Sequence, residues 1–376
     1  SGEKILIKKG NKIKNNDYLI SPNKFPRNDH DITIDLRDEF RDIDANIKLN
    51  KDSINLVNDN CWIEIDQTNW NKLVNIRRNK GLNRTDMSKK LNINKGVIQQ
   101  WEQKIDNVMP KYKDFKNYLA IVNIELHEIE FSFYIPIKYI KNEHMNSNLY
   151  YINHTKKYKS EIKIDNDFSY LMGWYLGDGT SSRGKKNPNR FCICIGNDKK
   201  HYLENIENVI RNSLNCNIII DENKKSNSVN LHFNSLEFHL MLKKLNLFGK
   251  RANEKFIPNE FYNIKKEQQM MLLRGLLESD GHIIVHKSKA IIGYSTVSEK
   301  LMNGIVLLYR QIGIIPSIGI GKSKDHFYNN KLIRSNYQRY NITISGFIQL
   351  ISIGSIWRYH KNAIKLQDFM KNITKF

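Results

Sequence analysis

Two related stretches decide the organisation of the C-terminal half of this 376-residue chain. Residues 169–179 read SYLMGWYLGDG, and residues 271–281 read MLLRGLLESDG. Both are apolar segments that end in an aspartate and a glycine, and the two aspartates, Asp178 and Asp280, lie 102 positions apart. An internal copy of this kind predicts two similar halves related by a pseudo-twofold axis.

Small residues four positions apart predict that each copy is a helix able to pack closely against another helix. These residues are Gly173 and Gly177 in the first copy and Gly275 and Ser279 in the second. Two such helices, packed side by side, would bring the aspartates together at their C-terminal ends. Carboxylates beside the negative ends of two helix dipoles repel each other unless a cation lies between them. Hard oxygen ligands on a basic protein favour Mg²⁺ bound together with nucleic-acid phosphates.

The order of predicted elements repeats after each motif. Each half is predicted to be αββαββα, which makes the fold class α+β. The segments after the first motif are 190–196, 200–214, 216–220, 229–233 and 235–245, and those after the second are 282–295, 298–312, 317–320, 340–344 and 345–351. Apolar and polar residues alternate in 229–234, which predicts a sheet with one buried and one polar face.

The two motifs resemble the signature blocks of LAGLIDADG homing endonucleases, of the dodecapeptide type found in inteins and introns. A glycine after a helix end is common, so either motif alone would be weak, but both at one register favour a functional pair. The resemblance covers roughly residues 165–376, with halves at about 165–263 and 264–376. It implies a monomer whose halves form a saddle over double-stranded DNA and hydrolyse one phosphodiester bond on each strand. It also implies Mg²⁺, for which Mn²⁺ can substitute, at a site made of Asp178, Asp280, Gly177 and Ser279.

The same family uses a lysine in each half to help polarise the attacking water. Lys255, in the segment KFIP (residues 255–258), resembles the family block that carries the first one. In the second half, Gly354 precedes Lys361 by seven positions, much as Gly249 precedes Lys255 by six. Lys361 is therefore the expected counterpart. For each lysine, the alternative is a solvated surface charge.

The polar sheet faces are expected to contact phosphates and base edges, because a two-stranded ribbon fits the major groove. The candidates in the first half are Arg183, Lys185, Lys186, Arg190, Asn230 and His232. Those in the second half are His286, Lys287, Lys322, Lys324, Arg339 and Asn341.

Three further segments are predicted before residue 165. Residues 1–65 form a small β-rich segment, residues 66–140 a helical domain, and residues 141–164 a polar linker. Pieces of the first segment, SGEKIL and DYLISP, resemble an intein's splicing domain. The chain ends in Thr374-Lys-Phe376 rather than in His-Asn, which argues against self-splicing.

The helical domain resembles a phage-repressor-like helix-turn-helix over residues 72–120. Residues 82–91 match its first helix, residues 97–102 its second, and Asn94 is the predicted N-cap of the second. Val97, Ile98 and Trp101 are expected in the core of the bundle. The resemblance implies that the second helix presents Lys95, Gly96, Gln99 and Gln100 to DNA.

The charge agrees with a polyanionic partner. The chain carries 60 Lys and Arg against 39 Asp and Glu, a net charge of +21, and residues 166–376 hold 31 basic and 16 acidic residues of these. No stretch approaches about 18 consecutive apolar residues, so no membrane contact is expected and the protein is predicted to be intracellular. Cys192 and Cys194 lie two apart in an apolar run and are predicted to be buried thiols.

Two other functions fit the same sequence. An RNA maturase on this fold would help an intron to fold without cutting DNA. A transcription regulator with a degenerate endonuclease domain would bind through its helix-turn-helix, and it would tolerate loss of either aspartate.

Overall fold

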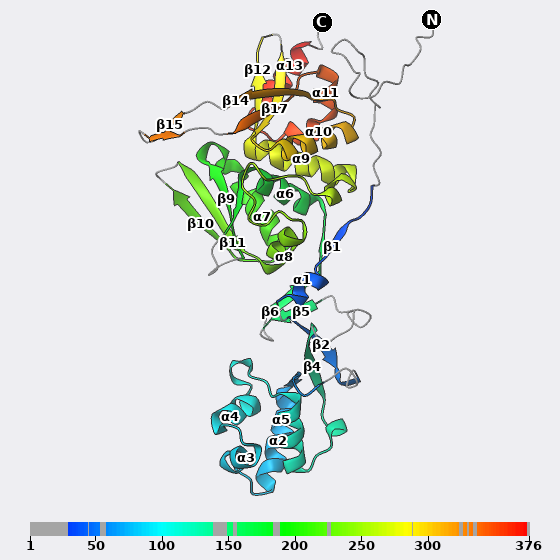
Figure 1. Ribbon diagram of the computed structural model, residues 1–376, viewed down its shortest axis with the longest axis vertical. Helices are drawn as coiled ribbons and strands as arrows, with labels where there is room; N and C mark the ends of the chain where they lie inside the picture. The colour runs from blue at the N-terminus through cyan, green and yellow to red at the C-terminus, as the bar shows by residue number, and fades with distance from the viewer. Residues whose placement is uncertain are drawn as a thin grey trace, which may run out of the picture. The chain divides into compact units, whose positions relative to one another are not determined.

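The computed structural model describes residues 29–43, 45–52, 58–137, 149–152, 156–182, 189–223, 227–287, 289–322, 326–328, 331–333 and 337–373 (Figure 1). The chain divides into two compact units. One unit is Asp31–Arg251, and the other is Ala252–Phe376 together with the residues up to His30. Each unit is described by itself below.

Four helices of the first unit form a bundle, and side-chain caps explain where the first three begin. They are α2 (Gln67–Asn79), α3 (Arg84–Leu91), α4 (Lys95–Gln103) and α5 (Tyr112–Val122), and short 3₁₀ helices follow at η3 (Ile105–Asn107) and η4 (Leu126–Glu128). Asn83 caps α3 in a reciprocal capping box with Asp86, and the Asn94 side chain accepts from the backbone N–H of Gly96 at 2.8 Å. Asn92 adopts a left-handed conformation, which ends α3 three residues before α4 begins.

The core of this bundle combines aromatic packing with one buried polar cluster. The Trp70 ring meets the Tyr118 ring edge-on at 5.6 Å between centroids. The Glu102 carboxylate, which has no exposed surface, accepts from Arg77 Nε at 3.0 Å, Arg84 Nε at 2.8 Å and the Tyr118 hydroxyl at 2.9 Å. Burial raises the pKa of the Tyr118 hydroxyl, and the Glu102 charge adds to this shift. The sequence pattern gave no sign of this cluster, because its members are brought together only by packing.

In the chain, the helical bundle comes between two strands that pair with each other in a five-stranded antiparallel sheet. The strands are β2 (Asn46–Asn50), β3 (Trp62–Ile65), β4 (Phe131–Pro136), β5 (Leu149–Ile152) and β6 (Lys156–Lys159), in the order β3-β4-β2-β5-β6. A second, two-stranded pair joins β1 (Thr33–Asp35) to β7 (Glu161–Lys163), and the short helix α1 (Arg37–Arg41) follows β1.

The polar linker predicted at 141–164 is wrong for its described part, which forms β5, β6 and β7. Two of these strands pair with distant parts of the chain: β5 pairs with β2 in the register Asn46↔Tyr151, and β7 pairs with β1. The third strand, β6, pairs with β5. Lysine-rich strands at a sheet edge are common, because the charge blocks further pairing. Apolar periodicity therefore could not reveal them.

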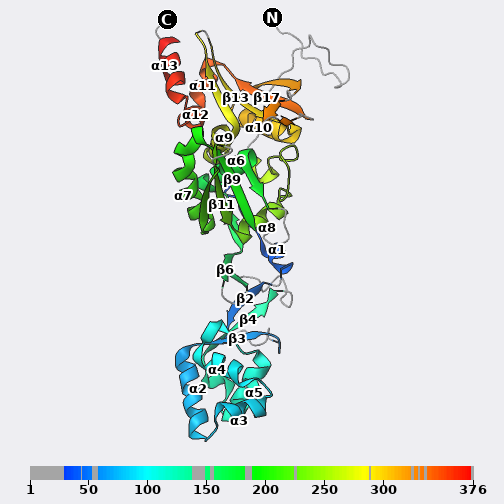
Figure 2. The same ribbon diagram turned by 90° about the vertical axis from the view of Figure 1, so that its left-hand side faces the viewer.

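The rest of the first unit is the first half, and it has the predicted αββαββα order. Its elements are α6 (Asn166–Asp178), β8 (Gly179–Ser181), β9 (Arg190–Gly196), η7 (Asn197–Tyr202) leading into α7 (Leu203–Leu214), β10 (Ile218–Asn223), β11 (Ser228–Asn234) and α8 (Leu236–Lys244). The sheet order is β10-β11-β9-β8, with β9 and β11 adjacent (Figure 2). Phe191, Ile193, Leu231 and Phe233 are buried on one face, as the alternation predicts.

The second half repeats this order in the other unit. After η8 (Asn259–Tyr262) come α9 (Lys266–Asp280), β12 (Gly281–Val285), β13 (Ala290–Thr296), α10 (Glu299–Gln311), β14 (Ser317–Lys322), β17 (Gln338–Ile344) and α11 (Phe347–Ser352). The sheet order β12-β13-β17-β14 places equivalent strands in the same sequence as in the first half. An additional antiparallel pair, β15 (His326–Tyr328) and β16 (Lys331–Ile333), lies between β14 and β17 in the chain, and α12 (Gly354–Trp357) and α13 (Ala363–Ile373) follow α11. The predicted α+β class and the repeated order are confirmed.

The Glu102 cluster predicts a large loss of stability in one variant. Glu102→Ala leaves the buried Arg77 guanidinium without its carboxylate partner, and removal of one partner of a buried ion pair costs about 3–5 kcal/mol. Hydrogen exchange of the amides in α2–α5 should accelerate accordingly. Glu130→Ala is the matched control, because its side chain is 71% exposed and its pair with Lys51 is a surface pair, expected to contribute less than about 1 kcal/mol. Equal effects in both variants would contradict the account of the cluster.

Candidate active site and nucleic-acid interface

In both halves the signature helix runs directly into the first strand, with no loop between them. The junctions are Asp178–Gly179 and Asp280–Gly281. A Cβ on Gly179 would lie 2.5 Å from the Cα of Tyr175, and a Cβ on Gly281 would lie 2.7 Å from the Cα of Leu277. Since real side chains do not fit at such distances, only glycine allows the strand to start against the last helical turn. This close approach fixes each aspartate at the end of its helix.

The first aspartate lies beside a lysine that the sequence analysis did not single out. The Asp178 side chain is 26% exposed, and its Oδ2 is 3.9 Å from the Nζ of Lys199 in η7. Gly177, which precedes it, is half-buried. The only sequence signal for Lys199 was a pair of lysines shortly after a predicted strand.

The second aspartate has different neighbours. Asp280 is exposed, whereas the preceding Ser279 is fully buried and its hydroxyl donates to the carbonyl of Leu276 at 2.9 Å. The Ser279 hydroxyl is therefore bound inside the helix. Directly before Ser279, the buried Glu278 carboxylate accepts from Nε of Arg274, one turn earlier in the helix, at 2.7 Å.

The donor chemistry at the junctions suits a hard divalent cation. Each junction offers a carboxylate at a helix C-terminus, where the helix dipole adds negative potential. Oxygen donors of this kind are those that Mg²⁺ and Mn²⁺ prefer. Within the part of the chain that the structure describes, no three His, Cys, Asp or Glu side chains gather to hold a metal. A cation at either junction would thus need water or phosphate oxygens to complete its coordination.

Lys255 lies in a segment that packs with the second half. Its backbone carbonyl accepts from the Ser298 hydroxyl at 2.6 Å, and the same hydroxyl caps α10 by accepting from the N–H of Leu301. The Lys255 side chain is only 5% exposed, so it is not the solvated surface charge of the alternative interpretation. The structure groups residues from Ala252 onward with the second half, whereas the sequence analysis placed Lys255 in the first.

Lys361 is exposed and lies between α12 and α13. The residue after it ties this segment to the strand that follows Asp280, because Nδ2 of Asn362 donates to the carbonyl of Ile283 at 3.1 Å. The backbone N–H of Asn362 also donates to Nδ1 of the buried His360. Lys361 is consequently held near β12, on the same unit as Asp280.

The open face of the first sheet carries part of the predicted DNA interface. In the cross-strand register, His232 pairs with Cys192, and Asn230 pairs with Cys194. Arg190 at the start of β9 is exposed, and Asn230 and His232 are half-buried. Burial lowers the pKa of His232, and the Arg190 charge adds to this effect.

The prediction that Cys192 and Cys194 are buried is wrong. Cys194 is exposed and Cys192 is half-buried, because their alternate positions put both on the open face rather than on the core face. Burial raises the pKa of the Cys192 thiol to about 11, so this thiol stays protonated at neutral pH.

The second sheet exposes the remaining predicted contacts that the structure describes. His286, Lys287, Lys322 and Arg339 are exposed, and Asn341 is half-buried. Oδ1 of Asn341 accepts from the Ser295 hydroxyl at 2.8 Å. The candidates Arg183, Lys185, Lys186 and Lys324 lie outside the described residues.

A half-buried histidine on this sheet escaped the sequence analysis. His282 is the second residue of β12 and pairs with Gly293 on β13. Burial lowers the pKa of its imidazole, and Arg339 contributes to the shift. A lone histidine after the aspartate–glycine pair gave no signal that could separate it from an ordinary strand residue.

Helix α4 carries the four predicted contact residues, and their exposure differs. Lys95 and Gly96 are exposed, and Gln99 and Gln100 are half-buried. Ile98 and Trp101 are buried in the bundle, whereas Val97 is only half-buried. Nε2 of Gln99 donates to Oε1 of Gln103 one turn later at 2.9 Å.

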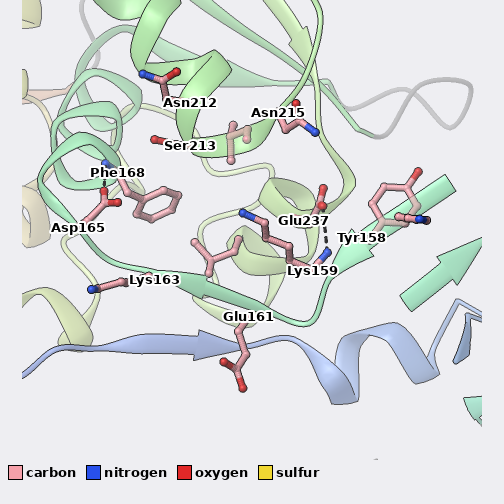
Figure 3. A pocket seen from close by; sticks show the side chains of 13 residues that line it. Tyr158, Lys159, Glu161, Lys163, Asp165, Phe168, Asn212, Ser213, Asn215 and Glu237 are labelled. Carbon is pink, nitrogen blue, oxygen red and sulfur yellow. Dashed lines mark hydrogen bonds between the residues drawn. The ribbon is translucent and has the colours of Figure 1, made fainter. Parts of the chain in front are cut away.

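A cavity of about 260 Å³ lies in the first unit between β6–β7, the C-terminal end of α7 and the N-terminal end of α8 (Figure 3). Lys157, Lys159, Lys163 and Glu237 are among its lining residues. The backbone N–H of Lys159 donates to Oε1 of Glu237 at 3.3 Å. Burial raises the pKa of the Glu237 carboxyl despite this hydrogen bond.

Comparison with known proteins identifies a domain within the second half. Residues 267–344 match the family model of a LAGLIDADG-like domain. This span runs from α9 to the end of β17 and contains the Asp280–Gly281 junction. Among the residues that the structure describes, no helix is long and apolar enough to cross a membrane.

Several curated proteins are similar to this chain over limited stretches. An uncharacterised protein of Methanocaldococcus jannaschii is 29% identical over 254 residues, which cover 64% of this chain and 26% of that protein. A DNA polymerase of Thermococcus aggregans is 24% identical over 57% of this chain and 12% of its own length. The glutamine–fructose-6-phosphate aminotransferase of M. jannaschii is 22% identical over 74% of this chain and 23% of its own length. The chain thus spans about a quarter or less of the length of each relative.

Two solved structures share part of the fold at a low level. The homing endonuclease I-DmoI in complex with DNA and Ca has a TM-score of 0.37 and 15% identity, over 55% of this chain and 98% of that one. Full-length WhiA from Thermatoga maritima has a TM-score of 0.38 and 11% identity, over 56% and 61% of the two chains.

The raised pKa of Glu237 predicts a pH-dependent stability difference. Because the folded protein holds this proton more tightly than the unfolded chain, the unaltered protein loses stability as the pH rises from the ordinary Glu pKa to the raised one. Glu237→Gln keeps an oxygen acceptor for the Lys159 backbone N–H, and because an amide does not titrate, this variant does not lose stability over that pH range. Its melting temperature relative to the unaltered protein should therefore be higher at pH 7.5 than at pH 4. Glu204→Gln, at an exposed position of α7, is the control. A relative melting temperature of Glu237→Gln that is the same at both pH values would contradict the burial of Glu237.

Proposed function

We propose that this protein is a site-specific double-strand DNA endonuclease of the homing type. The observation that carries the proposal is the repeated junction, in which an aspartate ends a signature helix and a glycine without room for a side chain starts a strand. One such junction lies within the segment that matches a LAGLIDADG-like domain. A catalytic pair needs both carboxylates at equivalent positions, and the two halves supply one each.

The residues take the following roles in this proposal. Asp178 and Asp280, with the backbone at Gly177 and Ser279, would hold Mg²⁺ or Mn²⁺. The cation would activate a water molecule and neutralise the negative charge that develops on the leaving oxygen. Lys255 and Lys361, which both belong to the unit Ala252–Phe376, help to polarise the attacking water, one for each half. The low exposure of Lys255 and the link of Asn362 to β12 support these two positions. The protein acts as a monomer, since both halves belong to one chain.

The open sheet faces bind the duplex in this proposal. Their exposed basic residues make phosphate contacts, and Asn230, His232 and Asn341 on the same faces supply base-edge contacts. The excess of basic residues in 166–376 strengthens the attraction to DNA and makes it dependent on salt.

The relatives support an origin as an intein or intron element. A DNA polymerase and an aminotransferase have unrelated activities by their names, yet each is similar to this chain over only a small part of its own length. A segment shared by otherwise unrelated proteins is what insertion of a mobile element would produce. This support concerns the origin of the segment and not the chemistry.

The helical bundle adds a second DNA contact in this proposal. α3 and α4 are joined by a short turn with a left-handed Asn92 and a capping Asn94, the arrangement of a helix-turn-helix. The span 72–116 carries 12 basic and 4 acidic residues. Lys95 and Gly96 reach the groove first, and Gln99 and Gln100 contact adenine edges.

Substitution of either aspartate tests the chemistry. Target duplexes are first selected from a random library on the full chain with Ca²⁺, and cleavage is then started with Mg²⁺. Asp178→Asn or Asp280→Asn should lower the cleavage rate by more than about 100-fold, the scale of losing one electrostatic group, while specific binding persists.

The matched controls are Asp167→Asn and Glu267→Gln, in the first turns of the same two helices, and they should cleave normally. Unchanged cleavage by the Asp178 and Asp280 variants would refute the nuclease assignment. Specific DNA binding without cleavage by the unaltered protein would favour a regulator, and preferential binding of intron RNA would favour a maturase.

Substitution of the α4 glutamines tests the helix-turn-helix. Gln99→Ala and Gln100→Ala should each weaken discrimination at one base pair by about 5- to 10-fold, measured by competition between selected and altered duplexes. Asn117→Ala, an exposed amide on α5, is the control and should change nothing. Identical base preferences in all three variants would show that the α4 glutamines do not contact the bases.

A further inference from the structure

The open face of the second sheet begins with one histidine. Because β12 starts at Gly281, directly after Asp280, His282 is the first side chain of this sheet beyond the aspartate. Its neighbour Ile283 is buried on the opposite face, as is the cross-strand residue Ile292. His282 therefore lies on the same face as Asn341.

The imidazole lies directly over the backbone of Gly293. These two residues are cross-strand partners. A Cβ placed on Gly293 would lie 2.5 Å from Cε1 of His282 and would also collide with its Nε2. Because no side chain fits there, the glycine leaves the space that the ring occupies. The ring therefore packs against the Gly293 backbone, and a residue with a side chain at position 293 would displace it.

Small residues lie across the strands from this half-buried ring. Next to Gly293 on β17 is Thr343, and the two outer positions on β14 that face Asn341 and Arg339 are Gly319 and Gly321. A Cβ on Gly321 would meet nothing within 4 Å, which leaves open space above that strand. A groove-binding ligand can thus approach this sheet closely, and the fixed imidazole offers it a hydrogen-bonding edge.

The first half has no such group at the equivalent position. There, Thr180 follows the Asp178–Gly179 junction, and its cross-strand partner is Cys192. The pair Thr180–Cys192 therefore corresponds to the pair His282–Gly293. The two halves differ in chemistry at the side chain nearest each aspartate, although their backbones follow the same order.

We propose that His282 is a specificity-determining residue, which contacts a base pair of duplex DNA beside the phosphate cut by the second half. This inference rests on the proposed function, because it takes Asp280 as the marker of the cut position. The ring position, supported by Gly293, sets the contact, and Thr180 cannot make the equivalent contact in the other half. The target is consequently discriminated differently at two positions related by the pseudo-twofold axis.

The test measures base preference, with the full-length protein and Ca²⁺, on all single-base variants of a selected duplex. His282→Ala should lower discrimination at one base pair of the second half-site by about 10-fold, while preferences elsewhere persist. Thr180→Ala is the matched control and should leave that base pair unaffected. A uniform loss over all base pairs, or no change at any of them, would overturn the proposal.

A double-mutant cycle tests the support of the ring. Gly293→Ala should displace the imidazole and lower the same preference, but it should add nothing in the His282→Ala background, where no ring remains to be displaced. Circular dichroism and hydrogen exchange of β12 and β13 show whether each variant folds. Additive losses in the double variant would overturn the role of Gly293. Failure of the unaltered protein to bind any duplex specifically would instead overturn the proposed function, and the inference with it.

Discussion

The structure depends on the absence of a side chain at two helix-to-strand junctions. Gly179 and Gly281 let a strand begin against the last turn of a buried helix, at distances that no Cβ permits. The chain turns there without a loop, and the preceding carboxylate has little freedom of position. Loops carry most functional residues in proteins, but a site on rigid elements holds its geometry more precisely. The proposed chemistry relies on that rigidity.

The two halves share a backbone plan and differ in the groups around it. Lys199 lies beside Asp178, whereas the helix that ends in Asp280 carries the buried pair of Arg274 and Glu278. The guanidinium of Arg274 also stacks on the Tyr359 ring at 4.1 Å. Such differences are possible because the two halves have separate sequences, so that each can change independently of the other.

The sequence predicted those features that depend on local patterns. The αββαββα order was predicted from apolar periodicity. The position of each aspartate at the end of a helix was predicted from the repeated spacing of the two motifs. Strands β5 and β7 were missed because they pair with strands more than 100 residues away in the chain, and β6 was missed because its lysines look like a linker. Cys194 was placed in the core because an apolar run does not tell which alternate residues face inward. The Glu102 cluster and the His282–Gly293 contact arise only from tertiary packing.

The central proposal is that Asp178 and Asp280 together bind divalent metal. The most direct measurement is a crystal structure of the full chain with its selected duplex and Mn²⁺, in which anomalous scattering locates the metal. The account predicts Mn²⁺ within coordination distance, about 2.2 Å, of carboxylate oxygens from both aspartates and of a scissile phosphate oxygen. Metal bound elsewhere, or aspartates separated beyond the reach of a shared centre, would contradict it.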